Sequence, residues 1–352
     1  MTDYDFFEQH IADVFYKVNK YLNIICNELE KKDSFLLNYS SLIDYLSQGI
    51  ITKLKDSVDY RLYDKKSNLT FMDVYNLARD IIESINPKYL RDYDKILDNG
   101  ILNFDYENNQ NPSSFTYDYD TNKMSININR SFSYRDVITL IHEYFHYTNY
   151  SENNSINQNI LTEFISIYFE TYTINYLRGI GISDEDINSY DRLDDLIKNY
   201  ELFKPYSEII TLFNNYGGVD KYCIDKYCER NENANFNFVI QKSVVLSFVL
   251  EVIEHNYYES ECKDFSLEEN LSEMFKDNYK YIIGIIFTFY AIDSVDKESI
   301  VLLNDNINTK ELGDMDTAEL LNMIGININD GSFIDKVVES IRKFVKSSEK
   351  QR

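Results

Sequence analysis

The sequence predicts a mainly helical protein with a small β-hairpin or sheet beside one central helix. Only three prolines and ten glycines interrupt 352 residues, which favours long helices over a β fold with many turns. Residues 115–119 and 124–128 instead alternate with a period of two on either side of a four-residue turn, as the strands of a hairpin do. The chain is long enough for one large domain or two smaller ones.

Apolar residues recur at helical spacing over most of the rest of the chain. The pattern predicts helices over residues 3–32, 34–56, 70–85, 161–179, 188–215, 236–258 and 266–293. We expect residues 1–100 to form an N-terminal helical region and residues 101–352 to form the catalytic region, packed together as one compact unit.

Charge and cysteine content exclude several classes of partner and site. A net charge of −24 argues against nucleic acid and anionic membranes as partners, because both need a basic surface. The first twenty residues lack the pattern of a secretory signal, and no stretch approaches the ~20 consecutive apolar residues of a membrane span. Cys223 and Cys228 lack a second cysteine pair, so we expect no structural zinc site there. The protein is therefore expected to be cytoplasmic.

The sequence His142-Glu143-Tyr144-Phe145-His146 lies on a segment that is predicted to be helical and uses two of the four histidines. Histidines four residues apart lie on one face of a helix, where both imidazoles can reach one metal ion. Glu143 is then placed to take a proton from a metal-bound water. Because a chance match in so histidine-poor a chain is expected roughly once in a few hundred cases, we interpret the motif as a metal site.

An acidic residue from a second helix would complete a site of two histidines and one glutamate. Glu163 stands near the start of the helix that follows the motif and is our candidate. Glu170, two turns further along the same face, is either a partner of a ligand or an alternative ligand. Asp136 and Glu152 are weaker candidates, and Ser133 with Asp136 is expected to cap the metal-binding helix. Such a ligand set favours one Zn²⁺ per chain.

The predicted hairpin precedes the metal-binding helix directly, and its role has two interpretations. An exposed strand edge beside the metal could pair with an extended peptide substrate. The hairpin could equally serve only to buttress the helix. The sequence leaves both open.

The motif with Glu163 resembles the gluzincin class of zinc metallopeptidases. Ser166 and Glu170, three and seven positions after Glu163, are similar to the pattern of the family that includes thimet oligopeptidase and oligoendopeptidase F. Residues 279–291 and 318–333 resemble the tyrosine-rich active-site helix and the closing helices of that family. The resemblance implies a helical zincin-type metallopeptidase fold, with zinc held by His142, His146 and Glu163.

The oxyanion of the tetrahedral intermediate needs a hydrogen-bond donor besides the zinc ion, and the same resemblance implies candidates for it. Tyr281 is the first choice, Tyr279 the second and His255 the third. The expected function is zinc-dependent hydrolysis of peptide bonds in peptides or unfolded segments. The alternatives are a narrow-specificity regulatory protease of one partner protein and a catalytically inactive, peptidase-like interaction protein. The oligomeric state is not indicated.

Overall fold

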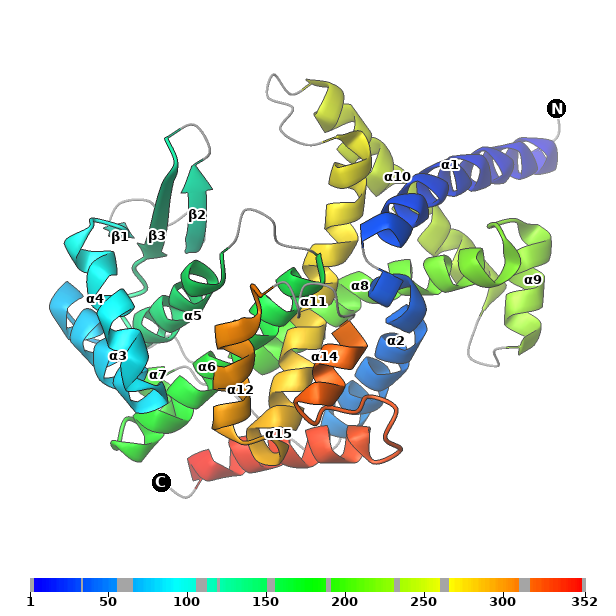
Figure 1. The fold of residues 1–352 in the computed structure, drawn as a ribbon. Coiled ribbons are helices and arrows are strands. Elements are labelled where there is room, and N and C mark those ends of the chain that lie inside the picture. Colours follow the sequence, from blue (N-terminus) through cyan, green and yellow to red (C-terminus); the bar gives the residue numbers. More distant parts are fainter. Residues whose placement is uncertain are drawn as a thin grey trace. The chain divides into compact units, whose positions relative to one another are not determined.

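The computed structural model is mainly helical and contains one small sheet, which confirms the predicted fold class (Figure 1). It describes residues 3–32, 34–55, 66–105, 113–118, 121–150, 156–187, 191–230, 235–259, 266–309 and 317–349. The chain divides into two packing units that interleave in the sequence. Unit 1 comprises Met1–Gln48 and Ile197–Tyr279, and unit 2 comprises Gly49–Leu196 and Lys280–Arg352. The predicted division into residues 1–100 and 101–352 coincides with no boundary of these units. That residues 101–352 carry the activity stays a prediction.

Unit 1 is built from helices. They are α1 (Asp3–Lys32), the first part of α2 (Ser34–Lys55), most of α8 (Asp191–Tyr216), α9 (Lys221–Arg230), α10 (Phe236–Glu259) and the first part of α11 (Leu267–Ser294). Helices α1 and α10 pack together, and each contributes buried apolar residues at helical spacing, such as Val18 and Leu22 on α1 and Leu246 and Leu250 on α10. These buried faces follow the predicted apolar periodicity.

Unit 2 contains the remaining helices and the sheet. The helices that lie wholly within it are α3 (Phe71–Ile85), the 3₁₀ helix η1 (Pro87–Tyr89), α4 (Leu90–Asp98), α5 (Arg135–Asn149), α6 (Ile156–Gly179), α7 (Asp184–Ile187), α12 (Lys297–Asn306), α14 (Thr317–Met323) and α15 (Phe333–Glu349). Helix α3 begins with a capping box, in which Thr70 and Asp73 each accept a hydrogen bond from the other's backbone N–H. Helix α5, which carries the histidine motif, packs against α3, α6 and the sheet.

The sheet has three strands in the order β1-β3-β2. Strands β2 (Ser114–Asp118) and β3 (Lys123–Asn129) form the predicted antiparallel hairpin, with Phe115 opposite Ile126. Strand β1 (Leu102–Asp105) pairs in parallel with β3 and was not predicted, because four residues are too few to show a period. Strand β2 therefore lies at an edge of the sheet, beside α5 (Figure 1).

A buried ion pair fixes the turn from β3 into α5. Arg130 Nε donates to Asp136 Oδ2 at 2.5 Å, and both side chains are about 1% exposed. The other carboxylate oxygen of Asp136 accepts the backbone N–H of Ser131 at 2.8 Å. The prediction that Ser133 and Asp136 cap the helix holds for Ser133, whose Oγ accepts the backbone N–H of Arg135 at 3.1 Å. It is wrong for Asp136, whose carboxylate is bound by Arg130 and by the backbone of Ser131.

Close packing brings α5, α6 and α11 together within unit 2. The Phe145 ring of α5 stacks on Phe169 of α6 with centroids 4.1 Å apart. Gly284 of α11 faces α6 so closely that an added Cβ would lie 2.7 Å from Ile167 Cδ1 and 3.5 Å from the backbone of Phe164. A side chain at this position would therefore push α11 away from the segment that carries Glu163.

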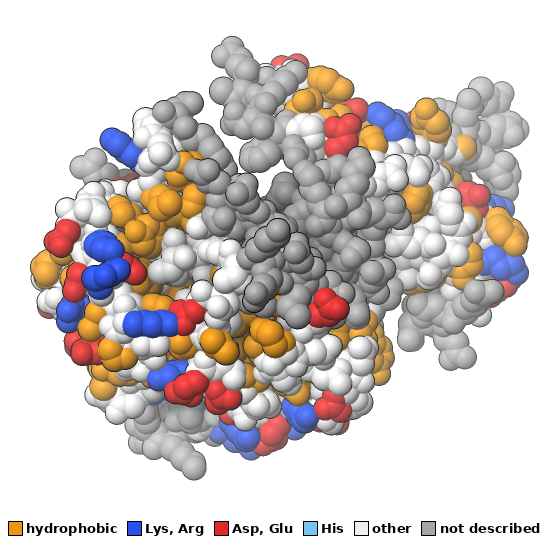
Figure 2. Space-filling view, viewed as in Figure 1, with side chains coloured by type: hydrophobic (Ala, Val, Ile, Leu, Met, Phe, Trp, Pro, Cys, Tyr) orange, Lys and Arg blue, Asp and Glu red, His pale blue; other side chains and the backbone are white. Residues whose placement is uncertain are grey.

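The described surface of unit 2 carries both signs of charge. In Figure 2, acidic and basic side chains lie interspersed along the lower part of the view. Several of them pair, among them Lys343 with Asp293 at 3.0 Å and Lys88 with Asp305. Exposed pairs of this kind add little stability, since solvent screens them.

Among the described helices, α10 is long and apolar enough to cross a membrane, judged only by length and composition. Core helices of soluble proteins pass the same test, and α10 includes Lys242 and Glu251. The absence of a membrane partner therefore stays a prediction.

We expect Gly284→Val to lower the free energy of unfolding by about 1–3 kcal/mol, because its Cβ would lie 2.7 Å from Ile167 Cδ1 and its two methyl groups would add further bulk between α11 and α6. The matched control is Gly179→Val, since a Cβ at Gly179 meets nothing within 4 Å. Urea unfolding followed by circular dichroism measures both. Equal stability of the two variants would contradict the close contact between α11 and α6.

Candidate metal centre

Helices α5 and α6 bring three metal-ligating side chains to one point. His142 and His146 come from successive turns of α5, and Glu163 comes from the second turn of α6. One ligand atom from each residue lies within 4.8 Å of the others. The two Nε2 atoms are 2.8 Å apart, and Glu163 places Oε1 3.6 Å from His142 Nε2 and Oε2 3.5 Å from His146 Nε2. The structure thus brings the three predicted ligands together.

The donor set and its spacing fit a zinc ion. A tetrahedral site with metal–ligand distances of 2.0–2.1 Å has edges of about 3.3 Å, close to the three distances observed. Glu163 is 1% exposed, and its buried Oε1 has no hydrogen-bond partner among the described residues. A buried carboxylate oxygen without a donor is expensive unless a cation satisfies it. Two imidazoles and one carboxylate are a usual zinc ligand set.

The buried charges of His142 and Glu163 stabilise each other. Burial lowers the pKa of His142, but the carboxylates of Glu170, Glu163 and Glu143 outweigh it and raise the pKa to about 9. Burial raises the pKa of Glu163, but His146, then His142 and Lys280, outweigh it and hold that pKa well below its usual range. The centre therefore favours an ionised Glu163 and a positive charge beside it.

Glu170 supports His142 from the side away from the metal-binding nitrogen. Its Oε1 lies 3.1 Å from His142 Nδ1, and Arg192 of α8 pairs with both oxygens of the same carboxylate. Arg192 also pairs with Asp195 at 2.9 Å. A carboxylate this close to Nδ1 favours a proton on that nitrogen and leaves Nε2 for a metal. Of the two roles that the sequence left open for Glu170, the geometry favours the supporting one.

Arg192 was not singled out from the sequence. It follows the second ligand helix by a dozen residues, and nothing in the local pattern separates it from other surface arginines. Burial lowers the pKa of Arg192, but Glu170 outweighs this effect. Burial raises the pKa of Glu170, but Arg192 and His142 bring it down to about 2. The pair therefore stays ionised.

Glu143 lies beside the ligands on α5 and is 7% exposed. Its Oε2 accepts the backbone N–H of Phe115 in the edge strand β2 at 2.7 Å. The hydrogen bond holds one carboxylate oxygen in place and leaves Oε1 for other partners. The sequence predicted the residue but not this bond, which joins positions 28 residues apart.

The three predicted oxyanion donors are placed differently. Tyr281 is half-buried on α11 in unit 2, one turn before Gly284, which contacts Phe164 next to Glu163. Tyr279 is buried and His255 is exposed near the end of α10, and both belong to unit 1.

Of the three candidates, Tyr281 is the one that belongs to unit 2, which also contains His142, His146 and Glu163. Asp136 pairs with Arg130 and is not in the ligand group, and Glu152 lies outside the described residues.

No protein-family model matches the chain, and no curated protein matches its sequence. A solved structure of PZ peptidase A with an inhibitor is similar to it, with a TM-score of 0.45 and 14% sequence identity. The match covers 96% of this chain but 59% of that one, so this chain spans less than two thirds of the length of its structural neighbour.

Zinc titration of purified variants tests the roles of the two glutamates. We expect Glu163→Ala to weaken zinc binding by more than about 100-fold, because it removes a ligand. Glu170→Gln should weaken binding by about 10–100-fold, because the support of His142 Nδ1 loses its charge. The control is Glu185→Gln on α7, an exposed glutamate of unit 2, which should bind zinc like the wild type. Wild-type affinity in Glu163→Ala together with a loss in Glu170→Ala would reverse the two assignments.

Proposed function

We propose that this chain is a zinc-dependent metallopeptidase of the gluzincin type. The observation that carries the proposal is the meeting of His142, His146 and Glu163 at one point, with Glu143 beside them on α5. Metal-ligand spacing alone would fit a structural zinc site, but such sites are closed by four protein ligands. Three ligands meet among the residues that the structure describes, and three protein ligands leave a fourth position for water or substrate, as in catalytic zinc sites.

The chain's own residues supply the proton transfers that peptide hydrolysis needs. A bound zinc ion would polarise the scissile carbonyl and lower the pKa of water toward about 7. Glu143 Oε1 accepts the proton of the attacking water while Phe115 N–H holds Oε2. The same carboxyl group then delivers the proton to the leaving amine. Tyr281 is the proposed donor to the oxyanion.

The edge strand β2 suggests how an extended substrate would bind. Its inner side pairs with β3, and its backbone contacts the general base through Phe115. A peptide that pairs with the outer side of β2 would run past Glu143 in extended form. The proposed substrates are therefore peptides or unfolded segments in the cytoplasm, with no nucleic-acid or membrane partner.

Two other functions share this site. A regulatory protease of one partner protein would use the same chemistry with a narrower substrate. An inactive interaction protein would need neither the general base nor its hydrogen bond to Phe115, and the chain retains both. The catalytic proposal is therefore favoured.

Glu143→Gln should abolish hydrolysis while zinc stays bound. The amide keeps the size of the carboxylate but cannot accept a proton, so we expect kcat to fall by about 10²–10⁴-fold. Zinc content by mass spectrometry and cleavage of a mixed fluorogenic peptide library measure both properties. Stoichiometric zinc without any Glu143-dependent cleavage would favour the interaction protein instead.

Tyr281→Phe tests the oxyanion donor. We expect kcat to fall by about 10²–10³-fold with little change in KM or zinc content, because the hydroxyl acts mainly in the transition state. Tyr279→Phe, the same change at the second candidate, two residues earlier on α11, should keep most activity, and a loss there instead would move the role to Tyr279. If His255→Gln lost activity and Tyr281→Phe did not, the order of the candidates would be wrong.

A further inference from the structure

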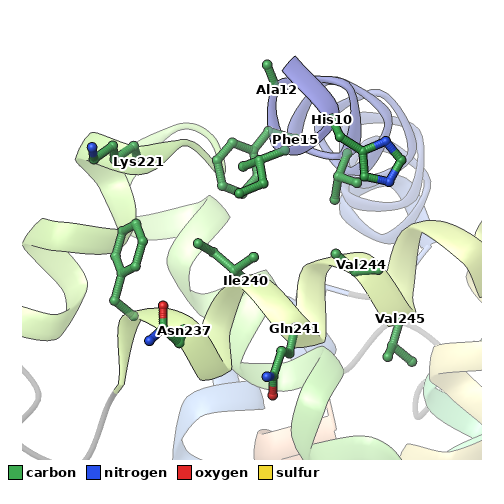
Figure 3. A pocket seen from close by; sticks show the side chains of 12 residues that line it. His10, Ala12, Phe15, Lys221, Asn237, Ile240, Gln241, Val244 and Val245 are labelled. Atoms are coloured by element: carbon green, nitrogen blue, oxygen red, sulfur yellow. The ribbon is translucent and has the colours of Figure 1, made fainter. Parts of the chain in front are cut away.

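A groove of about 1040 Å³ runs between α1 and α10 within unit 1. Its walls are mostly apolar and include Ile11, Val14, Phe15, Phe236, Ile240 and Val244. Figure 3 shows Ile240 and Val244 pointing from α10 toward Phe15 on α1, with Lys221 at one end and His10 at the other. The volume is at the upper end of the range of about 300–1,000 Å³ that is usual for small-molecule sites.

The apolar surface of α10 extends beyond the walls of this groove. Val244 is 40% exposed and Val245 55% exposed, and Phe238 and Phe248 on the same helix are 53% and 66% exposed. Apolar side chains so exposed on one helix mark a surface that binds something. The groove is the part of this surface with concave walls.

The charge at the groove is opposite to that of the chain. None of the twelve described residues that line the groove is acidic. The two ionisable residues that line the groove, Lys221 and His10, are both basic. In a chain of net charge −24, this arrangement favours an anionic group.

Lys221 is well placed to bind such a group. It is exposed, it is the first residue of α9, and it makes no ion pair within the part of the chain that the structure describes. The neighbouring carboxylate of Asp220 accepts the backbone N–H of Cys223 at 2.7 Å, at the start of the same helix.

We propose that this groove binds a single-chain anionic amphiphile, a long-chain fatty acid whose carboxylate lies at Lys221. Its hydrocarbon chain lies between Phe15 on one side and Ile240 and Val244 on the other. The apolar walls exclude water from the chain, and Lys221 distinguishes an anionic head group from a neutral one. This site is separate from the metal centre and does not depend on its activity, because all its lining residues belong to unit 1.

Equilibrium dialysis of the full chain with radiolabelled palmitate tests the proposal. We expect one saturable site with a Kd of about 1–100 μM. Val244→Asp should weaken binding at least about ten-fold, because it brings a carboxylate into the apolar groove. The matched control is Val252→Asp, which is on the same helix, is 39% exposed against 40% for Val244, and does not line the groove.

A second pair of variants tests the head group without touching the core. Lys221→Gln should weaken palmitate binding by about two- to five-fold, the effect of an exposed ion pair. Lys226→Gln on the same helix, whose ammonium group pairs with Glu229, should bind like the wild type.

Three results would overturn the proposal. They are the absence of saturable palmitate binding, equal loss in the two aspartate variants, and Val244-dependent sedimentation with phosphatidylglycerol vesicles in the absence of palmitate binding. The last result would show a membrane-docking surface.

Discussion

The candidate centre depends on the burial of two carboxylates on α6, Glu163 and Glu170, which lie two helical turns apart on the same face. Both are 1% exposed, and burial of a charge is costly unless an opposite charge compensates it. Arg192 compensates Glu170 with two hydrogen bonds. No such cation pairs with Glu163 within the described part of the chain, where its nearest opposite partners are His142 and His146.

The residues of the centre lie on rigid helices rather than on loops. Two helices carry the ligands, and aromatic stacking between Phe145 and Phe169 fixes their spacing close to the histidines. The buried pair of Arg130 and Asp136 fixes where α5 begins relative to the sheet. As a result, both the ligands and Glu143 have little freedom to move apart, which is what a catalytic metal site requires.

The sequence was informative wherever a period or a fixed spacing carries the information. The helices, the hairpin and the ligands His142, His146 and Glu163 all follow from such local patterns. Arg192, strand β1 and the bond from Phe115 to Glu143 join segments that only the fold brings together, so no local pattern contains them. The capping role predicted for Asp136 failed for the same reason, since its carboxylate binds Arg130 and Ser131, which lie before the helix.

The negative charge of the centre can be balanced by a metal ion or, in part, by a proton. The ion pair between Glu170 and Arg192 has no net charge, which leaves Glu163 and Glu143 as two negative groups on neighbouring turns of α6 and α5. A bound divalent metal ion would balance these two charges. Without it, a proton on His142, whose pKa is raised to about 9, balances only one of them. Because an imidazole must be neutral to bind zinc, a metal ion that bound here would displace this proton.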